Sequence, residues 1–329
     1  MIETKWIDVG GTWLPDIAAM VRERLEKHGP LKENHDFASI GRLVTRQLTN
    51  TRGATGVMRL SESGKCIRAR AYSLHHWEPN GHTIDAGSSI TFAIGDLTEA
   101  FLVAATTEAL SGNEDVSLYN SGSEQLEVYL DVPVFNSRTA RVLGHPDGVI
   151  NIKQPGSNQV VQAIMEYKSM SDYGFKMFRK MGLTEDDQYY YQIQGYMRAR
   201  EIMTDSPCEW TYVMAWGKSS TSNQAVIDVG NGDWWKLFPL IGQWIPKNPT
   251  IQSKIVSDYH LLFNSTDVNE FSRPYGPAKS GKKKGELKFP CSYCSYYKHC
   301  FPGSYETAAE SKWLQKTEKV KVMVPEGSG

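Results

Sequence analysis

The chain has 329 residues, of which 40% are hydrophobic and 22% charged, and this is enough to bury a large core. These values exclude a disulfide-stapled miniprotein and a disordered tail. The 36 Lys and Arg residues nearly balance the 37 Asp and Glu residues, so the net charge of -1 gives no overall basic signal for a nucleic-acid partner. Any binding of a polyanion must therefore come from local charge.

The sequence predicts a protein of the cytoplasm. We find no stretch that approaches the roughly 20 apolar residues needed to span a bilayer, and the first residues do not resemble a signal peptide. Five cysteines are an odd number and too few for a secreted disulfide framework, and three of them lie between Cys291 and Cys300.

The first part of the chain is predicted to be helical. Apolar residues at helical spacing predict a helix within 13–29, and residues 1–58 are interpreted as an accessory or packing segment. A second helix is predicted within 59–77, where Ser61 or Ser63 would form the N-cap. A third is predicted at 89–110.

The pattern then changes to that of strands. Three segments rich in Val, Ile, Leu and Tyr predict a three-stranded meander, at 126–135, 139–152 and 158–170. A helix at 186–203 and strands at 209–218 and 224–230 follow, and the chain is predicted to be helical again over 234–263. Helices before and after a central sheet predict a mixed α/β fold.

Three ionisable residues fall in segments that otherwise have the composition of buried strands: Asp147, Glu166 and Lys168. A buried, unpaired charge costs several kcal/mol, so pairing or function must account for each of them. Residues two apart on a strand share a face, so Glu166 and Lys168 project together while Tyr167 points away. If the two strands are neighbours, Asp147 joins them.

Two carboxylates and a nearby backbone carbonyl, that of Tyr167, form a hard oxygen site suited to Mg²⁺ or Mn²⁺. Such an ion holds a phosphate oxygen and acidifies a bound water, and a lysine beside that water orients it or helps to deprotonate it. This is the chemistry of phosphodiester hydrolysis. A Glu-x-Lys pair alone is weak evidence, because a solvated strand pair gives the same spacing.

Further residues are candidates for the same site. Gln192 and Tyr196 lie one turn apart on one face of the predicted helix. Asp96 and Glu99 lie on the earlier helix, where either could supply another carboxylate. His145 precedes Asp147 by two residues and would share its strand face, as a metal ligand, as a donor to a ligand, or as a structural histidine.

With these residues the sequence resembles the RecB-like branch of the PD-(D/E)xK nucleases, including phage recombination exonucleases of the lambda-exonuclease type, over roughly residues 60–300. The resemblance implies a restriction-endonuclease-like core and roles for six residues: Glu99, Asp147, Glu166, Lys168, Gln192 and Tyr196. The three carboxylates would bind the metal, the lysine would activate water, and the glutamine and tyrosine would position the site and the DNA backbone. Many RecB-like members carry a histidine on the early helix, where this chain offers Asp96 or Glu99, and Glu99 fits the phage version better.

The late cysteines have the spacing Cys291-x₂-Cys294-x₅-Cys300, which suits an iron–sulfur cluster or zinc. A fourth ligand is needed. His299 would complete a Cys₃His zinc site, whereas Cys208 lies at the start of a predicted strand and is interpreted as an inert core thiol.

Cys66 is different, because the segment Ser61-x-Ser63-x-x-Cys66-x-Arg68 resembles that of RecB-like nucleases with a 4Fe-4S cluster, among them CRISPR-associated RecB-like nucleases. The resemblance implies a cluster on Cys66 and the three late cysteines, joining the two ends of the nuclease domain. Zinc, or no ligand at all, remains the alternative. The domain boundaries that follow are an accessory segment at 1–58, a nuclease domain at 59–305 and a tail at 306–329.

Basic residues supply candidate phosphate contacts: Arg68, Arg70, Lys282, Lys283 and Lys284. The lysine run alone is more typical of a solvated, flexible loop. The tyrosines at 189–191 and Tyr196 could stack on unpaired bases or pack in the core.

The leading hypothesis is a metal-dependent DNA exonuclease in recombination or end processing, including a phage-encoded one. The alternatives are a flap or junction endonuclease, and a non-catalytic nucleic-acid-binding protein on a degenerate nuclease fold. No P-loop sequence is present, so helicase activity would need a partner, and a recombination or annealing protein is a second expected partner.

Overall fold

The computed structural model describes residues 3–28, 41, 44–45, 57–79, 86–119, 126–217, 240–273, 290–291 and 294–301. The chain divides into two compact units. The first unit comprises Met1–Gly64 and Ala86–Asn264, and the second comprises Lys65–Asp85 and Ser265–Gly329. The helix η1, at Leu60–Glu62, therefore belongs to the first unit and α3, at Ile67–Leu74, to the second.

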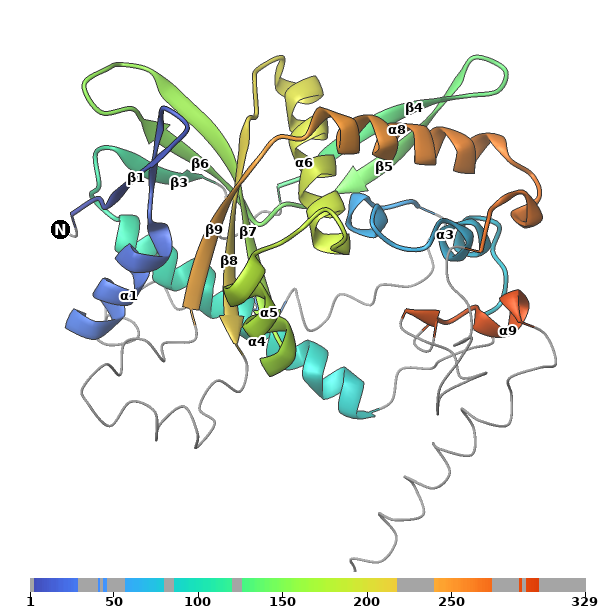
Figure 1. The fold of residues 1–329 in the computed structure, drawn as a ribbon, viewed down its shortest axis with the longest axis horizontal. Coiled ribbons are helices and arrows are strands. Elements are labelled where there is room, and N and C mark those ends of the chain that lie inside the picture. The colour runs from blue at the N-terminus through green and yellow to red at the C-terminus, as the bar shows by residue number, and fades with distance from the viewer. Residues whose placement is uncertain are drawn as a thin grey trace, which may run out of the picture. The chain divides into compact units, whose positions relative to one another are not determined.

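A five-stranded sheet forms the centre of the first unit, in the order β3-β6-β7-β8-β9 (Figure 1). Its strands are β3 (Val116–Tyr119), β6 (Gly148–Lys153), β7 (Val160–Met170), β8 (Trp210–Gly217) and β9 (Leu240–Pro246). Strands β7 and β8 are parallel, and the other neighbours are antiparallel. The predicted mixed α/β fold is therefore confirmed.

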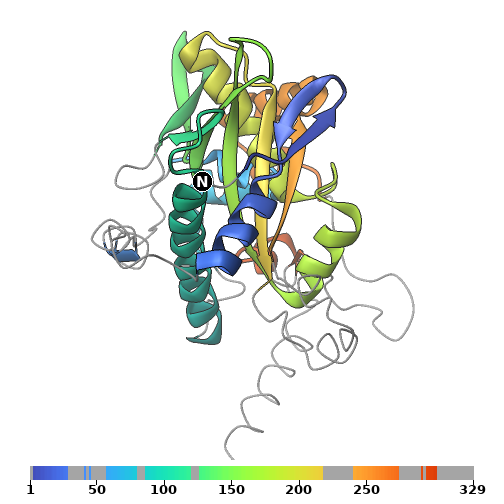
Figure 2. The same ribbon diagram turned by 90° about the vertical axis from the view of Figure 1, so that its left-hand side faces the viewer.

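Helices cover both faces of the sheet, and alternate side chains of β7 pack against helices on opposite faces. Met165 and Tyr167 belong to the hydrophobic core that includes α1 (Ile17–His28) and α4 (Ala86–Leu110), the two helices that lie side by side in Figure 2. Glu166, which lies between them, faces the opposite way, toward α6 (Gln188–Thr204). Helix α5 (Asp172–Met181) precedes α6 in the connection between the parallel strands.

The expected three-stranded meander is corrected to four strands in two sheets. The segment 139–152 divides at Pro146 into β5 (Arg138–Gly144) and β6, because proline has no N–H to continue a ladder. Strand β5 pairs with β4 (Val128–Val134) in a separate hairpin, which packs against α6 and α8 (Pro249–Asn264). Asp147 consequently lies in the bend before β6, so the expectation that it shares a strand face with His145 is also corrected.

Other boundaries differ from the sequence prediction. Residues 240–246 form strand β9 where a helix was expected, since their apolar and aromatic side chains pack and pair along β8. Helix α3 takes Cys66 as its N-cap, not Ser61 or Ser63. The structure also contains elements that the sequence analysis did not predict, among them α5, β3 and a hairpin of β1 (Trp6–Val9) and β2 (Thr12–Pro15). The predicted strand at 224–230 and the tail at 306–329 lie outside the described residues.

One helical stretch, Ser89–Leu110 within α4, is long and apolar enough to cross a membrane by length and composition alone, with a mean hydropathy of 1.3. This differs from the expectation that no stretch approaches such a length. The C-terminal half of the helix explains its composition, because Leu102, Ala105 and Ala109 are buried in the core of the first unit. Ile90, Phe92 and Ile94 near its start are exposed.

The second unit is organised around a buried arginine on α3. The guanidinium of Arg68 donates to the carbonyl of Phe271 at 2.9 Å and to Oδ1 of Asn269 at 2.7 Å. These acceptors follow or lie in the short helix η3 (Val268–Glu270). The charge-assisted bonds join two segments that are two hundred residues apart in the chain.

Gly64→Ala should destabilise the first unit, because a Cβ at residue 64 would lie 2.3 Å from Cα of Gln188 at the start of α6. Backbone must shift to relieve this contact, and we expect a loss of about 2 kcal/mol in the free energy of unfolding, measured in urea. Gly174→Ala in α5 is the matched control, since its Cβ would meet only ordinary contacts at 3.4 Å or more. Equal effects of the two substitutions would contradict this packing.

Candidate active site

The first unit brings Asp147, Glu166 and Lys168 together where β6 begins beside β7. The last register pair between these strands is Gly148 with Met165, so Asp147 lies next to Glu166 and Tyr167 of β7. Oδ2 of Asp147 accepts a hydrogen bond of 2.7 Å from the backbone N–H of Tyr167. The carboxylate of Asp147 thus accepts the hydrogen bond from Tyr167 at the point where the ladder between β6 and β7 stops.

The carbonyl of Tyr167 points toward the same side as its N–H, because both groups of one residue in an antiparallel ladder face the same neighbour. That side is where Asp147 lies. The backbone oxygen of Tyr167 therefore points toward the side of β7 on which Asp147 lies.

Glu166 lies on the opposite face of β7, toward α6, and its side chain is only 1% exposed. Its Oε1 atom accepts hydrogen bonds from Nζ of Lys168 and, at 2.6 Å, from Nε2 of Gln192. Nε2 of Gln192 also contacts the hydroxyl of Tyr196 at 3.0 Å. The Oε2 atom of Glu166 is buried and has no hydrogen-bond partner in the described part of the chain.

Burial and repulsion disfavour two carboxylates at this place. Burial, and then the negative charge of Glu166, raise the pKa of Asp147 to about 7, although Lys168 and the Tyr167 N–H oppose the shift. Burial also raises the pKa of Glu166. Burial alone would lower the pKa of Lys168, but the carboxylates of Glu166 and Asp147 raise it above its ordinary value. Lys168 is therefore a cation at neutral pH in the absence of a bound metal.

Glu99 lies beside this cluster, on α4. A hydrogen bond with Glu99 lowers the pKa of Asp147, and the charge of Glu99 contributes to the raised pKa of Glu166. Asp96 lies one turn earlier on the same helix and is half-buried. His145 lies 3.4 Å from Oε2 of Glu127, measured from its Nε2 atom.

The donor set fits a hard divalent cation. Glu166 has a buried carboxylate oxygen without a hydrogen-bond partner in the described ranges, and the carboxylate of Asp147, just before β6, is near enough for the charge of Glu166 to raise its pKa. A bound cation would also remove the repulsion that raises the pKa of Asp147. Within the described ranges, no group of three His, Cys, Asp or Glu side chains is placed to hold a metal ion by itself.

Tyr189 is a neighbour of Lys168 that the sequence interpretation did not identify, since its ring lies 5.2 Å from Nζ of Lys168. The helical spacing gave a signal for it: Tyr189 precedes Gln192 by three residues and so shares its face of α6. The contact adds a second constraint on the lysine besides the carboxylate of Glu166.

The four candidate cluster cysteines all belong to the second unit: Cys66, Cys291, Cys294 and Cys300. Burial, followed by repulsion from the other three thiols, raises the pKa of Cys291 to about 11. Cys66 and Cys300 also contribute to the raised pKa of Cys294. Sγ of Cys300 lies 3.9 Å from the hydroxyl of Tyr72. Burial raises the pKa of Cys208 to about 12, and this residue is in the first unit.

The arginines expected to contact DNA are placed differently. Arg68 and Arg70 are 4% and 3% exposed, and Arg68 is used within the second unit, so burial replaces the surface role expected from the sequence. Lys282, Lys283 and Lys284 lie outside the described residues.

No protein-family model and no curated protein matches the chain. Among solved structures, the chain is similar to LHK-Exo in complex with dAMP, with a TM-score of 0.37 and 12% identity over 68% of this chain and 89% of that chain. A second structure of LHK-Exo, an alkaline exonuclease from Laribacter hongkongensis, gives 0.33 and 11% over the same shares. A phage-related exonuclease from Haemophilus somnus gives 0.31 and 14% over 63% of this chain and 93% of that chain.

Lys168→Met should destabilise the metal-free protein by about 3 kcal/mol, because it leaves Glu166 as a buried charge without its cation. The double variant Glu166→Gln, Lys168→Met should recover most of that loss. Urea denaturation in EDTA measures both values.

Lys254→Met is the control for this cycle, because Lys254 forms an exposed pair with Asp258 at 2.7 Å on α8. We expect a loss below about 0.5 kcal/mol there. A double variant as unstable as Lys168→Met alone would contradict the proposed dependence of Glu166 on Lys168.

Proposed function

We propose that this protein is a DNA exonuclease that uses Mg²⁺ or Mn²⁺ to hydrolyse phosphodiester bonds. The observation that carries the proposal is the arrangement of Asp147, Glu166 and Lys168, with a buried carboxylate oxygen of Glu166 left without a hydrogen-bond partner. Two carboxylates that repel each other are costly for the fold, and a cation between them removes that cost.

Asp147, Glu166 and the carbonyl of Tyr167 would hold the metal, and Glu99 is the further carboxylate in reach of Asp147. When bound, the metal supplies Lewis acidity: it polarises the scissile phosphate and lowers the pKa of a water molecule. His145 remains a weaker candidate, since its ring lies beside Glu127.

The remaining residues act through their contacts with Glu166. Lys168 is held as a cation by Oε1 of Glu166, which suits it to orienting the attacking water and to balancing charge on the phosphate. Gln192 fixes the orientation of the same carboxylate and is in turn bonded to Tyr196. This pair positions Glu166 so that Oε2 stays directed toward the metal region.

Exonuclease activity on DNA is favoured over a flap or junction endonuclease by the resemblance to phage recombination exonucleases and by the carboxylate, Glu99, on α4. A non-catalytic role is disfavoured because the three reactive side chains lie together instead of apart. We infer a place in recombination or end processing in the cytoplasm, including in a phage-infected cell, with an annealing protein or helicase as partner.

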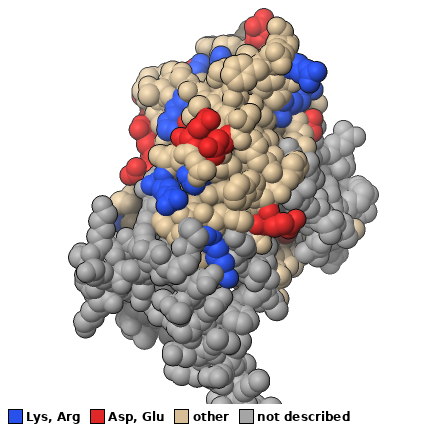
Figure 3. Space-filling view, turned by 90° about the vertical axis from the view of Figure 1, so that its right-hand side faces the viewer, with Lys and Arg blue, Asp and Glu red and all other residues tan. Residues whose placement is uncertain are grey.

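Charge on the surface is mixed. On the face drawn in Figure 3, Lys and Arg side chains are interspersed with Asp and Glu, and they do not gather into one basic patch. The described residues on this face therefore offer no single basic surface for a polyanion.

We also propose that the four cysteines of the second unit hold a 4Fe-4S cluster. Burial and the neighbouring thiols raise the pKa of Cys291 and Cys294, so a cationic centre that binds these two residues as thiolates would relieve both burial and repulsion. Zinc is the alternative occupant. A cluster there would join α3 to the segment 291–300 and so stabilise the second unit.

Wild-type protein with Mg²⁺ or Mn²⁺ should degrade labelled DNA from its ends, whereas Glu166→Gln and Lys168→Ala should each lose about 100-fold or more of the rate. A gel assay that compares linear and circular duplexes, and single strands, separates exonuclease from endonuclease activity. Metal should raise the melting temperature of wild type but not of Asp147→Asn, because that variant lacks a ligand. Equal cutting by wild type and Lys168→Ala would remove the support for this site.

Anaerobically prepared protein should be brown, with visible absorption that bleaches on reduction, and Cys66→Ser should lose this colour. Cys208→Ala is the control and should keep it, since Cys208 belongs to the first unit. Iron and sulfide analysis gives the stoichiometry. A colourless wild type with stoichiometric zinc would exclude the cluster.

A further inference from the structure

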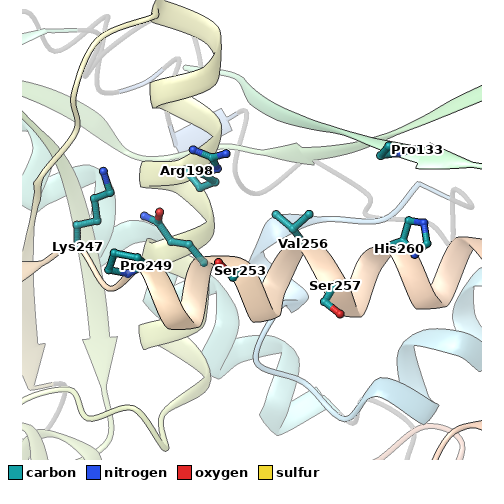
Figure 4. Close-up of a pocket in the computed structure, with 9 residues that line it drawn as sticks. Pro133, Arg198, Lys247, Pro249, Ser253, Val256, Ser257 and His260 are labelled. Carbon is teal, nitrogen blue, oxygen red and sulfur yellow. The ribbon is translucent and has the colours of Figure 1, made fainter.

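A pocket of about 720 Å³ lies on the outer side of α6, between this helix, α8 and the hairpin strand β4 (Figure 4). It is lined along one face of α8, because its lining residues recur there at helical spacing: Pro249, Gln252, Ser253, Val256, Ser257 and His260. Arg198 of α6, Lys247 and Pro133 of β4 complete the lining. All of these residues belong to the first unit.

The pocket is separate from the carboxylate cluster. Gln192 and Tyr196 of α6 face Glu166, whereas Arg198 follows Tyr196 by two residues and so projects about 200° away around the helix. Helix α6 therefore has the carboxylates on one side and the pocket on the other.

One polar group in the pocket points to a ligand. Gln252 is only 4% exposed, and its Nε2 atom is buried with no hydrogen-bond partner within the described ranges. An amide group left in this state costs about 1 to 3 kcal/mol, so a buried donor of this kind requires an explanation. A ligand oxygen seated in the pocket would satisfy it.

The chemistry of the lining indicates an anion. The nine described lining residues include Arg198, Lys247 and His260 but none with a carboxylate, and the hydroxyls of Ser253 and Ser257 add further donors. Lys247 already pairs with Glu201 at 2.6 Å and Glu209 at 3.2 Å. Arg198 is the more available cation, since its side chain is 45% exposed and its contact with Glu201 is 3.8 Å long.

The shape indicates a chain and not a single ion. From Pro249 to His260 the lined face of α8 runs eleven residues, or about 16 Å, which is several times the roughly 3.4 Å rise of one nucleotide in a DNA strand. Pro133, Pro249 and Val256 supply apolar surface between the donors. A sugar–phosphate backbone alternates charged and less polar groups in the same way.

We propose that this groove binds the phosphodiester backbone of a DNA strand, as a second contact away from the scissile bond. The inference rests on the proposed function, because it takes DNA as the substrate. Arg198 and the Nε2 atom of Gln252 bind phosphate oxygens, and the serine hydroxyls donate to the same backbone. Such contacts fix position without reading sequence.

The test is the affinity for a fluorescein-labelled oligothymidylate of about 12 nucleotides, measured by anisotropy in EDTA so that no strand is cut. Arg198→Gln should weaken binding by about tenfold and should lower the slope of log affinity against log salt by about 1. Lys254→Gln is the matched control: it removes one positive charge from α8 outside the groove, where Lys254 pairs with Asp258, and should change affinity less than about twofold. Equal effects of the two variants would overturn the groove.

Gln252→Met separates binding from folding. The substitution removes the buried donor without changing the size of the side chain, so the melting temperature should stay the same or rise while DNA affinity falls severalfold. A lower melting temperature with unchanged affinity would overturn the role of Gln252.

Failure of the groove and failure of the exonuclease assignment are distinguishable. If wild type cuts DNA but both groove variants bind it as wild type does, the groove inference fails alone. If wild type neither binds nor cuts any DNA, both fail together.

Discussion

The structure depends on holding two carboxylates close together where water is excluded. Asp147 and Glu166 repel each other in a region of low dielectric, and one ammonium group, that of Lys168, offsets only part of this charge. A core built for stability alone would place apolar side chains here. The two carboxylates outnumber the one ammonium group, and this excess of negative charge lowers the stability of the fold. A bound cation would offset it.

The geometry of the strands β6 and β7 places these charged side chains together. Alternation on β7 sends Glu166 and Lys168 to one face and Tyr167 to the other, where Tyr167 packs in the core with α4. Strand β6 begins only at Gly148, so the backbone N–H of Tyr167 has no strand partner there and donates to the carboxylate of Asp147. The central sheet thus supplies rigidity, and the interruption of one of its strands supplies the reactive edge.

Patterns with a fixed period could be predicted from the sequence. The shared face of Glu166 and Lys168 and the one-turn spacing of Gln192 and Tyr196 both follow from such periods, and the structure places all four side chains in contact. Interruptions and partners could not be predicted. After Pro146 the chain leaves the β4–β5 hairpin for the central sheet, and the strand at 240–246 depends on pairing with β8; neither partner is visible in the local sequence. The burial of Arg68 required acceptors two hundred residues away.

Helix α6 has neighbours on two sides, and this has a thermodynamic consequence. Its inner face orients the carboxylate of Glu166 through Gln192, and its outer face carries Arg198 toward α8. Because both faces belong to one helix, a ligand that displaces α6 at the groove would also change the free energy of metal binding at the carboxylate cluster. Linkage makes such an effect symmetric: whatever factor occupancy of the outer groove applies to metal affinity, metal must apply to occupancy of the groove. Through α6, occupancy of the proposed groove and the metal affinity of the carboxylate cluster would then depend on each other.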